Sequence, residues 1–248
     1  MPQSVKEGPM PVFKDNKTLK ADARESLLGN LTTAVLSIFI YVMASSVLAE
    51  LIAGFDTGSV LLSLILTTVM FLVISICGNM LGIGLSYIFL RLQYQKGAKV
   101  GDLFTAFRGS SDAAVIVSTF LAALRLLCFL PLGILLSVLS AEGRSAYRIP
   151  LLLLFMAGYA AAFVIRIRYS MLPYLLLDFP QLLPKEHIRG GVKLIRGHKM
   201  RLFRLYLSFL PLQLLTVLSF GIAGLWVSSY ERAAEAAFYK DLIENTFT

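Results

Sequence analysis

The chain has 248 residues, of which 57% are hydrophobic and 15% are charged, and its formal net charge is +8. Apolar runs take up most of this length and leave no stretch long enough for a separate soluble domain. The composition therefore predicts one helical membrane domain and excludes a soluble globular fold. We expect no nucleic-acid partner, because membrane topology by itself concentrates basic residues on one side of the bilayer.

Residues 1–29 are polar and contain three prolines among scattered lysines, which is not typical of a cleavable signal peptide. We interpret them as a cytoplasmic amino-terminal segment, followed by a single membrane domain at 30–243 and a short tail at 244–248. The apolar runs predict spans near 31–53, 60–92, 113–140, 149–177, 202–220 and 222–242.

Whether the chain has five or six spans depends on the last of these segments, which carries several charges. Three short lead-ins with a similar ending precede an apolar hairpin, at 27–30, 107–110 and 195–198, spaced by 80 and then 88 residues. A true triplication would give an all-α fold of about six transmembrane helices in three hairpins, each preceded by a short amphipathic segment. The alternative is that glycine caps three unrelated helices.

The distribution of basic residues predicts the orientation. Five Lys and Arg precede the first run, four lie between Arg91 and Asp112 and seven lie at 178–204, which makes sixteen, whereas the intervening connections hold two, Arg144 and Arg148. Because basic loops stay in the cytoplasm, we expect the amino terminus there, and with six spans the carboxyl terminus as well.

The segment that starts at Pro184 predicts an amphipathic helix on the membrane surface. Its basic face consists of Lys185, Arg189, Lys193 and Arg196. Each cation near an anionic leaflet contributes about 1 kcal/mol, so we expect contact with the bilayer and its anionic inner-leaflet headgroups. Positive-inside topology alone is the simpler explanation for the same residues.

One arginine stands at membrane depth. Arg125 has twelve uncharged residues before it, at 113–124, and thirteen after it, at 126–138. A sixth span would bring Glu231, Arg232 and Glu235 to the same depth. This intramembrane charge set is interpreted either as a structural ion pair between Arg125 and a glutamate or as a polar, water-filled cavity for a substrate.

The residues give no indication of catalysis. His187 and His198, the two histidines, lack carboxylate or cysteine neighbours at metal-ligand spacing, so we expect no metal site, no catalytic residue and no cofactor. Gly78, Gly82 and Gly84 lie within an apolar run, where they favour close helix packing over nucleotide binding.

Several motifs resemble a family of bacterial integral membrane proteins, catalogued as domain of unknown function nine-seven-five, over nearly the whole chain. The motifs are Gly82-Ile83-Gly84-Leu85-Ser86 with Phe89; Asp102-Leu103-Phe104 with Phe107; Tyr169-Ser170-Met171 with Pro173-Tyr174 and Asp178; Gly197-His198-Lys199 with Arg201-Leu202-Phe203 and Ser208-Phe209; and Gly221-Ile222 with Leu225-Trp226, Tyr230 and Ala237-Phe238-Tyr239-Lys240-Asp241-Leu242. The resemblance implies a helical protein of the bacterial cytoplasmic membrane and assigns no activity. The chain is also distantly similar to the membrane domain of some glycerophosphodiester phosphodiesterases.

Together these observations predict a membrane protein without catalytic chemistry of its own, acting as a scaffold or accessory factor in envelope processes with a possible membrane-protein partner. The alternative is a transporter or lipid-handling protein with a polar mid-membrane site around Arg125.

Overall fold

The computed structural model describes residues 13–50, 59–108, 112–142 and 148–247, and the regular structure within them is helical. The α-helices are α1 (Asn16–Leu27), α2 (Leu31–Glu50), α3 (Val60–Gln93), α4 (Thr105–Arg108), α5 (Asp112–Glu142), α6 (Arg148–Tyr169), α7 (Leu172–Asp178), α8 (Pro184–Leu194), α9 (Lys199–Leu207), α10 (Leu210–Leu218) and α11 (Gly224–Phe247), and a 3-10 helix, η1 (Val100–Phe104), precedes α4. The predicted all-α class is confirmed.

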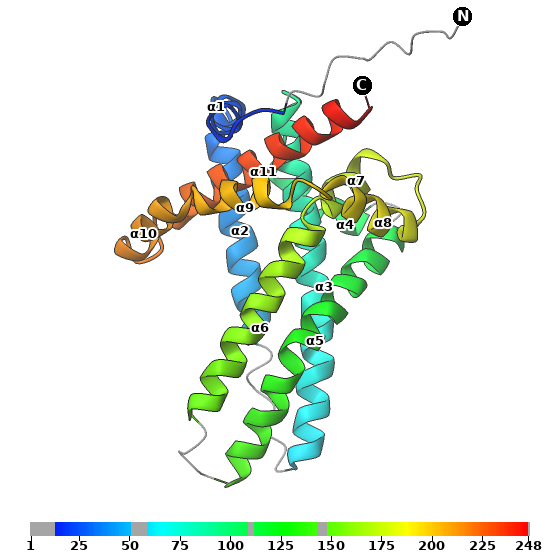
Figure 1. The fold of residues 1–248 in the computed structure, drawn as a ribbon, viewed down its shortest axis with the longest axis vertical. Helices are drawn as coiled ribbons and strands as arrows, with labels where there is room; N and C mark the ends of the chain where they lie inside the picture. Colours follow the sequence, from blue (N-terminus) through cyan, green and yellow to red (C-terminus); the bar gives the residue numbers. More distant parts are fainter. Residues whose placement is uncertain (1–12, 51–58, 109–111, 143–147, 248) are drawn as a thin grey trace, which may run out of the picture.

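Four long helices form the upright part of the molecule, as two hairpins made by α2 with α3 and by α5 with α6 (Figure 1). They supply four of the five stretches that are long and apolar enough to cross a membrane. These five stretches are Leu31–Leu48, Leu61–Gln93, Asp112–Gly133, Pro150–Asp178 and Lys199–Leu218. The protein is therefore a polytopic helical membrane protein. The glycine-containing run predicted as the second span, near 60–92, forms the single continuous helix α3 of 34 residues.

Most of the remaining helices gather at one end of the upright bundle, and we name this end the capped end. Figure 1 places α1, α4, α7, α8, α9 and α11 there. The opposite or distal end holds the start of α3, the end of α5 and the start of α6, and α2 runs from the capped end toward it. Helix α1, the connection after α3 and the basic segment around α8 thus lie at the same end of the described chain. Their position relative to the cytoplasm stays a prediction.

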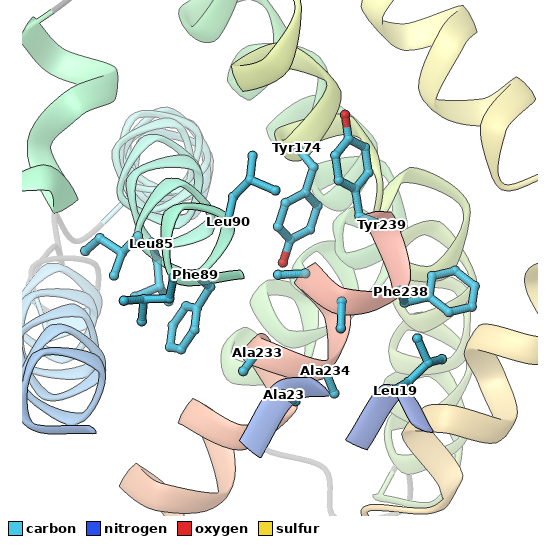
Figure 2. Packing of buried hydrophobic residues seen from close by; sticks show 14 of the residues in the cluster. Leu19, Ala23, Leu85, Phe89, Leu90, Tyr174, Ala233, Ala234, Phe238 and Tyr239 are labelled. Carbon is cyan, nitrogen blue, oxygen red and sulfur yellow. The ribbon is translucent and has the colours of Figure 1, made fainter. Parts of the chain in front are cut away.

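The buried core lies at the capped end. Figure 2 shows Leu19 and Ala23 of α1 beside Ala234 and Phe238 of α11, with Phe89 of α3 nearby. These residues are all 1% exposed or less. Small alanines on α11 let α1 and α3 approach closely, and the aromatic rings fill the space between the helices.

The distal half has the opposite character, because its large apolar side chains point outward. On α3, Leu61 is 69% exposed and Val73 is 50% exposed, whereas Leu85 farther along the same helix is fully buried. A helix of 34 residues is about 51 Å long and exceeds the ~30 Å hydrocarbon core. The exposed apolar half of α3 therefore fits the lipid, and its buried half packs inside the capped end.

The third hairpin departs from the other two. The predicted spans near 202–220 and 222–242 correspond to α9 with α10 and to α11, but both run across the upright helices instead of alongside them (Figure 1). Among the described residues, α11 is not one of the five stretches suited to crossing a membrane. The reason lies in packing, since α11 buries its face against α1, α2 and α3.

Two of the three lead-in glycines explain the similar endings of those segments. Gly29 follows α1 with a φ of +79°, and Gly197 follows α8 with a φ of +90°. Only glycine adopts such angles without strain, and both glycines allow the chain to turn into the next helix. Gly109, the third, lies outside the described residues.

Candidate functional site: a charged cavity at the capped end

Arg125 projects from α5 toward α3. Its guanidinium Nη1 donates a hydrogen bond of 2.8 Å to Oδ1 of Asn79, and Asn79 in turn donates through Nδ2 to the backbone oxygen of Ser118 at 3.0 Å. The Asn79 amide is therefore held by one bond to α5 and orients the arginine through the other. Asn79 itself is 8% exposed.

The direct pairing of Arg125 with Glu231 or Glu235 is not found in the structure. Glu231 forms an ion pair of 3.2 Å with Arg166 and accepts a hydrogen bond of 3.0 Å from Gln213. Because α11 crosses the bundle instead of running beside α5, its carboxylates meet the end of α6 and not the middle of α5.

Glu235 is the most deeply buried of these charges, with 3% of its surface exposed. Its two oxygens are both occupied, one accepting from the Tyr206 hydroxyl at 2.9 Å and the other from Arg232 at 3.4 Å. The four residues of the predicted charge set thus lie near one another. The glutamates, however, pair with other arginines than Arg125: Glu231 with Arg166 and Glu235 with Arg232.

These groups surround a cavity of about 240 Å³ between α2, α3, α5, α6 and α11. Its polar and charged lining residues are Tyr41, Asn79, Ser86, Arg125, Arg166, Tyr169, Ser170, Arg232 and Glu235. A second cavity of about 230 Å³ shares Tyr41, Arg166 and Arg232 with the first and adds Glu231. The structure therefore has a cavity lined by polar and charged side chains at this position. That it holds water or a substrate stays a prediction.

The cavity carries a surplus of positive charge. The two adjoining cavities are lined by three arginines and two glutamates, a difference of +1. Arg166 and Arg232 each have a carboxylate partner, whereas no carboxylate among the described residues lies within ion-pair distance of Arg125. A guanidinium has five N–H donors, so Arg125, which is hydrogen-bonded to an uncharged amide, keeps donors with which it could bind an anion.

Glycines open this cavity. A Cβ atom added at Gly78 or Gly82 would meet no neighbouring atom within 4 Å, and both residues line the cavity. Gly84 and Gly158 do serve packing, since a Cβ at Gly84 would lie 1.8 Å from the Leu103 carbonyl oxygen and one at Gly158 would lie 3.1 Å from that of Cys128. The predicted role in close helix packing therefore holds for Gly84 but not for Gly78 and Gly82.

The basic face of the fourth polar segment is separate from the cavity. Lys185, Arg189 and Lys193 are exposed on α8, and Arg196 is exposed just after it. The opposite side of α8 is buried at His187, which bonds through Nε2 to the Phe179 oxygen at 3.0 Å. Contact of the basic face with headgroups stays a prediction. Across the described residues, no group of three His, Cys, Asp or Glu side chains is placed to hold a metal ion.

Residues that sequence reasoning missed complete the site. Asn79 is the one side-chain amide within the apolar run 60–92, and this isolated polar residue could have indicated a buried polar contact. Arg166, near the end of α6, stacks on Tyr206 with 5.2 Å between its guanidinium carbon and the ring centroid. Tyr41 had no signal in the sequence, because a single tyrosine in a span is unremarkable.

The model of the family described as "Protein of unknown function (DUF975)" matches residues 10–246. The chain belongs to this family. The DUF975 match runs from before α1 to the last turn of α11 and includes the crosswise third hairpin. No curated protein and no solved structure matches the chain. The distant similarity to glycerophosphodiester phosphodiesterases therefore stays a prediction.

Proposed function

We propose that this DUF975 protein handles an anionic amphiphile, such as a phospholipid, and binds its headgroup in the charged cavity around Arg125. The observation that carries the proposal is the surplus cation, Arg125 on α5, which donates a hydrogen bond to the neutral amide of Asn79. An uncompensated charge within a span costs at least ~2.5 kcal/mol, and a bound anion would lower this cost by neutralising the Arg125 guanidinium. Phosphate and carboxylate oxygens match the planar donors of a guanidinium.

The position of the cavity favours an amphiphile over a small soluble anion. The cavity lies among membrane-spanning helices, and the Arg166 side chain at its edge is 46% exposed. The cavity volume of about 240 Å³ is below the ~300–1,000 Å³ of typical small-molecule sites. A cavity of this size suits the headgroup of a lipid whose acyl chains stay in the bilayer. The protein is proposed to act in the bacterial cytoplasmic membrane, with both termini in the cytoplasm and anionic inner-leaflet lipids within reach.

Native mass spectrometry of the purified protein tests the proposal. Wild-type protein extracted in mild detergent should retain an anionic lipid, and Arg125→Gln should reduce its affinity roughly ten- to hundredfold, because charge-assisted hydrogen bonds contribute ~1.5–3 kcal/mol. Arg168→Gln is the matched control, since Arg168 lies two residues from Arg166 on α6 and is not among the cavity-lining residues. Equal lipid occupancy in a folded Arg125→Gln protein would reject the proposal.

A scaffold or accessory role is the second candidate, and one observation favours it. Ala157, Ala160 and Ala161 are exposed along α6, where small side chains would let a helix of another membrane protein approach closely. Cross-linking in native membranes tests this role. Replacement of Ala160 and Ala161 by leucine should abolish a specific heterologous cross-link while lipid retention at Arg125 is unchanged; an identical cross-linking pattern would exclude this surface.

A further inference from the structure

The hairpin formed by α10 and the start of α11 has an apolar tip that the rest of the protein leaves uncovered. None of the α10 residues is buried. Around the turn, Val217 and Leu218 are each 76% exposed, Phe220 is 97% exposed and Ile222 is 67% exposed. In Figure 1 this tip projects sideways from the capped end, away from the upright helices.

The turn of the hairpin is built tightly. Phe220 has a φ of 53° and Gly221 a φ of +90°, and the Gly221 amide donates to the Thr216 oxygen at 2.8 Å. Gly224 allows α11 to pass against α10, because a Cβ there would lie 2.8 Å from a side-chain carbon of Thr216. The start of α11 therefore packs closely against α10.

The base of the hairpin is attached to the folded core by cationic side chains. Lys20 of α1 donates through Nζ to the Ser208 oxygen at 2.9 Å, and its ammonium lies 4.5 Å from the centre of the Phe209 ring. Arg24 lies over the Tyr230 ring at 5.4 Å. Arg201 of α9 pairs with Asp241 of α11. These contacts hold the start of α10 at the capped end and fix its crosswise direction.

The length of α10 sets how far the tip reaches. Its nine residues extend about 14 Å, roughly half of the ~30 Å hydrocarbon core. The apolar stretch Lys199–Leu218 reaches 20 residues only by including α9, which the contacts above bind to the core. We infer that residues 210–226 form a hairpin that is embedded in the acyl chains of a single leaflet, on the side of the capped end, and does not cross the bilayer.

The charges around the hairpin fit that environment. Lys20, Arg24 and Arg204 lie at its base, at the level where anionic headgroups attract cations, whereas the tip from Val217 to Ile222 carries no charge. Acyl chains are therefore the occupant of this surface. The inference concerns a different part of the molecule from the charged cavity and does not depend on what that cavity binds.

The single tryptophan makes the contact with lipid measurable without a mutation. Trp226 is 48% exposed beside the tip and is the one tryptophan of the chain. In vesicles made with brominated phosphatidylcholines, Trp226 fluorescence should be quenched by bromines on the acyl chains. Unchanged fluorescence would place the tip in water or against a second protein and would overturn the inference.

Sided labelling then separates insertion into one leaflet from a full span. With Cys77 and Cys128 replaced by alanine, Phe220→Cys is treated with a membrane-impermeant maleimide from each face of the vesicles. Glu50→Cys, at the distal end of α2, and Lys199→Cys, at the start of α9, are controls that report the two faces. Phe220→Cys should never react from the face at which Glu50→Cys reacts; a reaction there would show that α10 crosses the bilayer. Because Phe220 is 97% exposed, its substitution removes no internal packing.

Discussion

Two stacked tyrosines at the capped end differ in one hydrogen bond. Tyr174 of α7 and Tyr239 of α11 are both fully buried, with ring centres 5.2 Å apart (Figure 2). The Tyr239 hydroxyl donates to Oδ2 of Asp178 at 2.8 Å, whereas the Tyr174 hydroxyl has no hydrogen-bond partner among the described residues. A buried hydroxyl without a hydrogen-bond partner adds no stability compared with a phenylalanine ring at the same position.

We therefore expect opposite results from the same substitution at the two positions. Tyr239→Phe should lower the free energy of unfolding by about 1–3 kcal/mol, because the Asp178 carboxylate loses its donor. Tyr174→Phe should leave it unchanged or raise it slightly. Thermal unfolding in detergent measures both, at roughly 2–4 °C per kcal/mol for a chain of this size. A comparable loss for Tyr174→Phe would mean that its hydroxyl is hydrogen-bonded after all.

Among the helices, α11 has the most decisive role, because it joins segments that are far apart in the sequence. Asp241 is 1% exposed, pairs with Arg201 of α9 and accepts a hydrogen bond of 3.2 Å from the backbone amide of Lys14. Arg201 also lies over the rings of Phe13 and Phe238, at 5.1 and 4.9 Å. One buried carboxylate thus fixes α11, α9 and the chain before α1 together.

Removing that carboxylate should loosen all three segments. Asp241→Ala leaves Arg201, whose side chain is only 19% exposed, without its carboxylate partner. We expect the free energy of unfolding to fall by about 3–5 kcal/mol. The control is Glu244→Ala, one turn farther along α11. Its carboxylate is 54% exposed and lies 4.0 Å from the Lys240 ammonium, so that its loss should cost about 0–1 kcal/mol. Thermal unfolding and proteolysis of α11 provide the measurement. Equal losses for the two variants would show that α11 is held by apolar packing alone.

At the scale of the whole molecule, the segments richest in Lys and Arg lie at one end. The described parts of the three segments before α2, between α3 and α5 and around α8 gather at the capped end, and α11 ends there too (Figure 1). A hairpin that stays within one leaflet gives four spans, and a hairpin that crosses gives six. Both numbers are even, so both return the carboxyl terminus to the side of the amino terminus.

Reporter fusions test this topology. A reporter joined after Thr248 should show cytoplasmic activity, and one joined after Glu50, at the distal end of α2, should show activity on the other side of the membrane. External activity after Thr248 would require an odd number of spans and would refute the common position of both termini.

Composition and residue pattern by themselves determined the class of protein and the two upright hairpins. These features follow from local preferences, because an apolar run of sufficient length favours lipid and a positive φ favours glycine wherever they occur. The family resemblance also rested on local motifs, and the match over residues 10–246 confirms it.

Only the tertiary structure decided where the charges meet. The depth of Glu231 and Glu235 was inferred from an upright sixth helix, but long-range contacts such as Arg201 with Asp241 turn α11 across the bundle. Arg125 consequently bonds to Asn79, 46 positions earlier in the chain. Hydrophobic periodicity records which segments avoid water, but it carries no information about the direction in which a helix leaves the core, and that direction determines which charged side chains become neighbours.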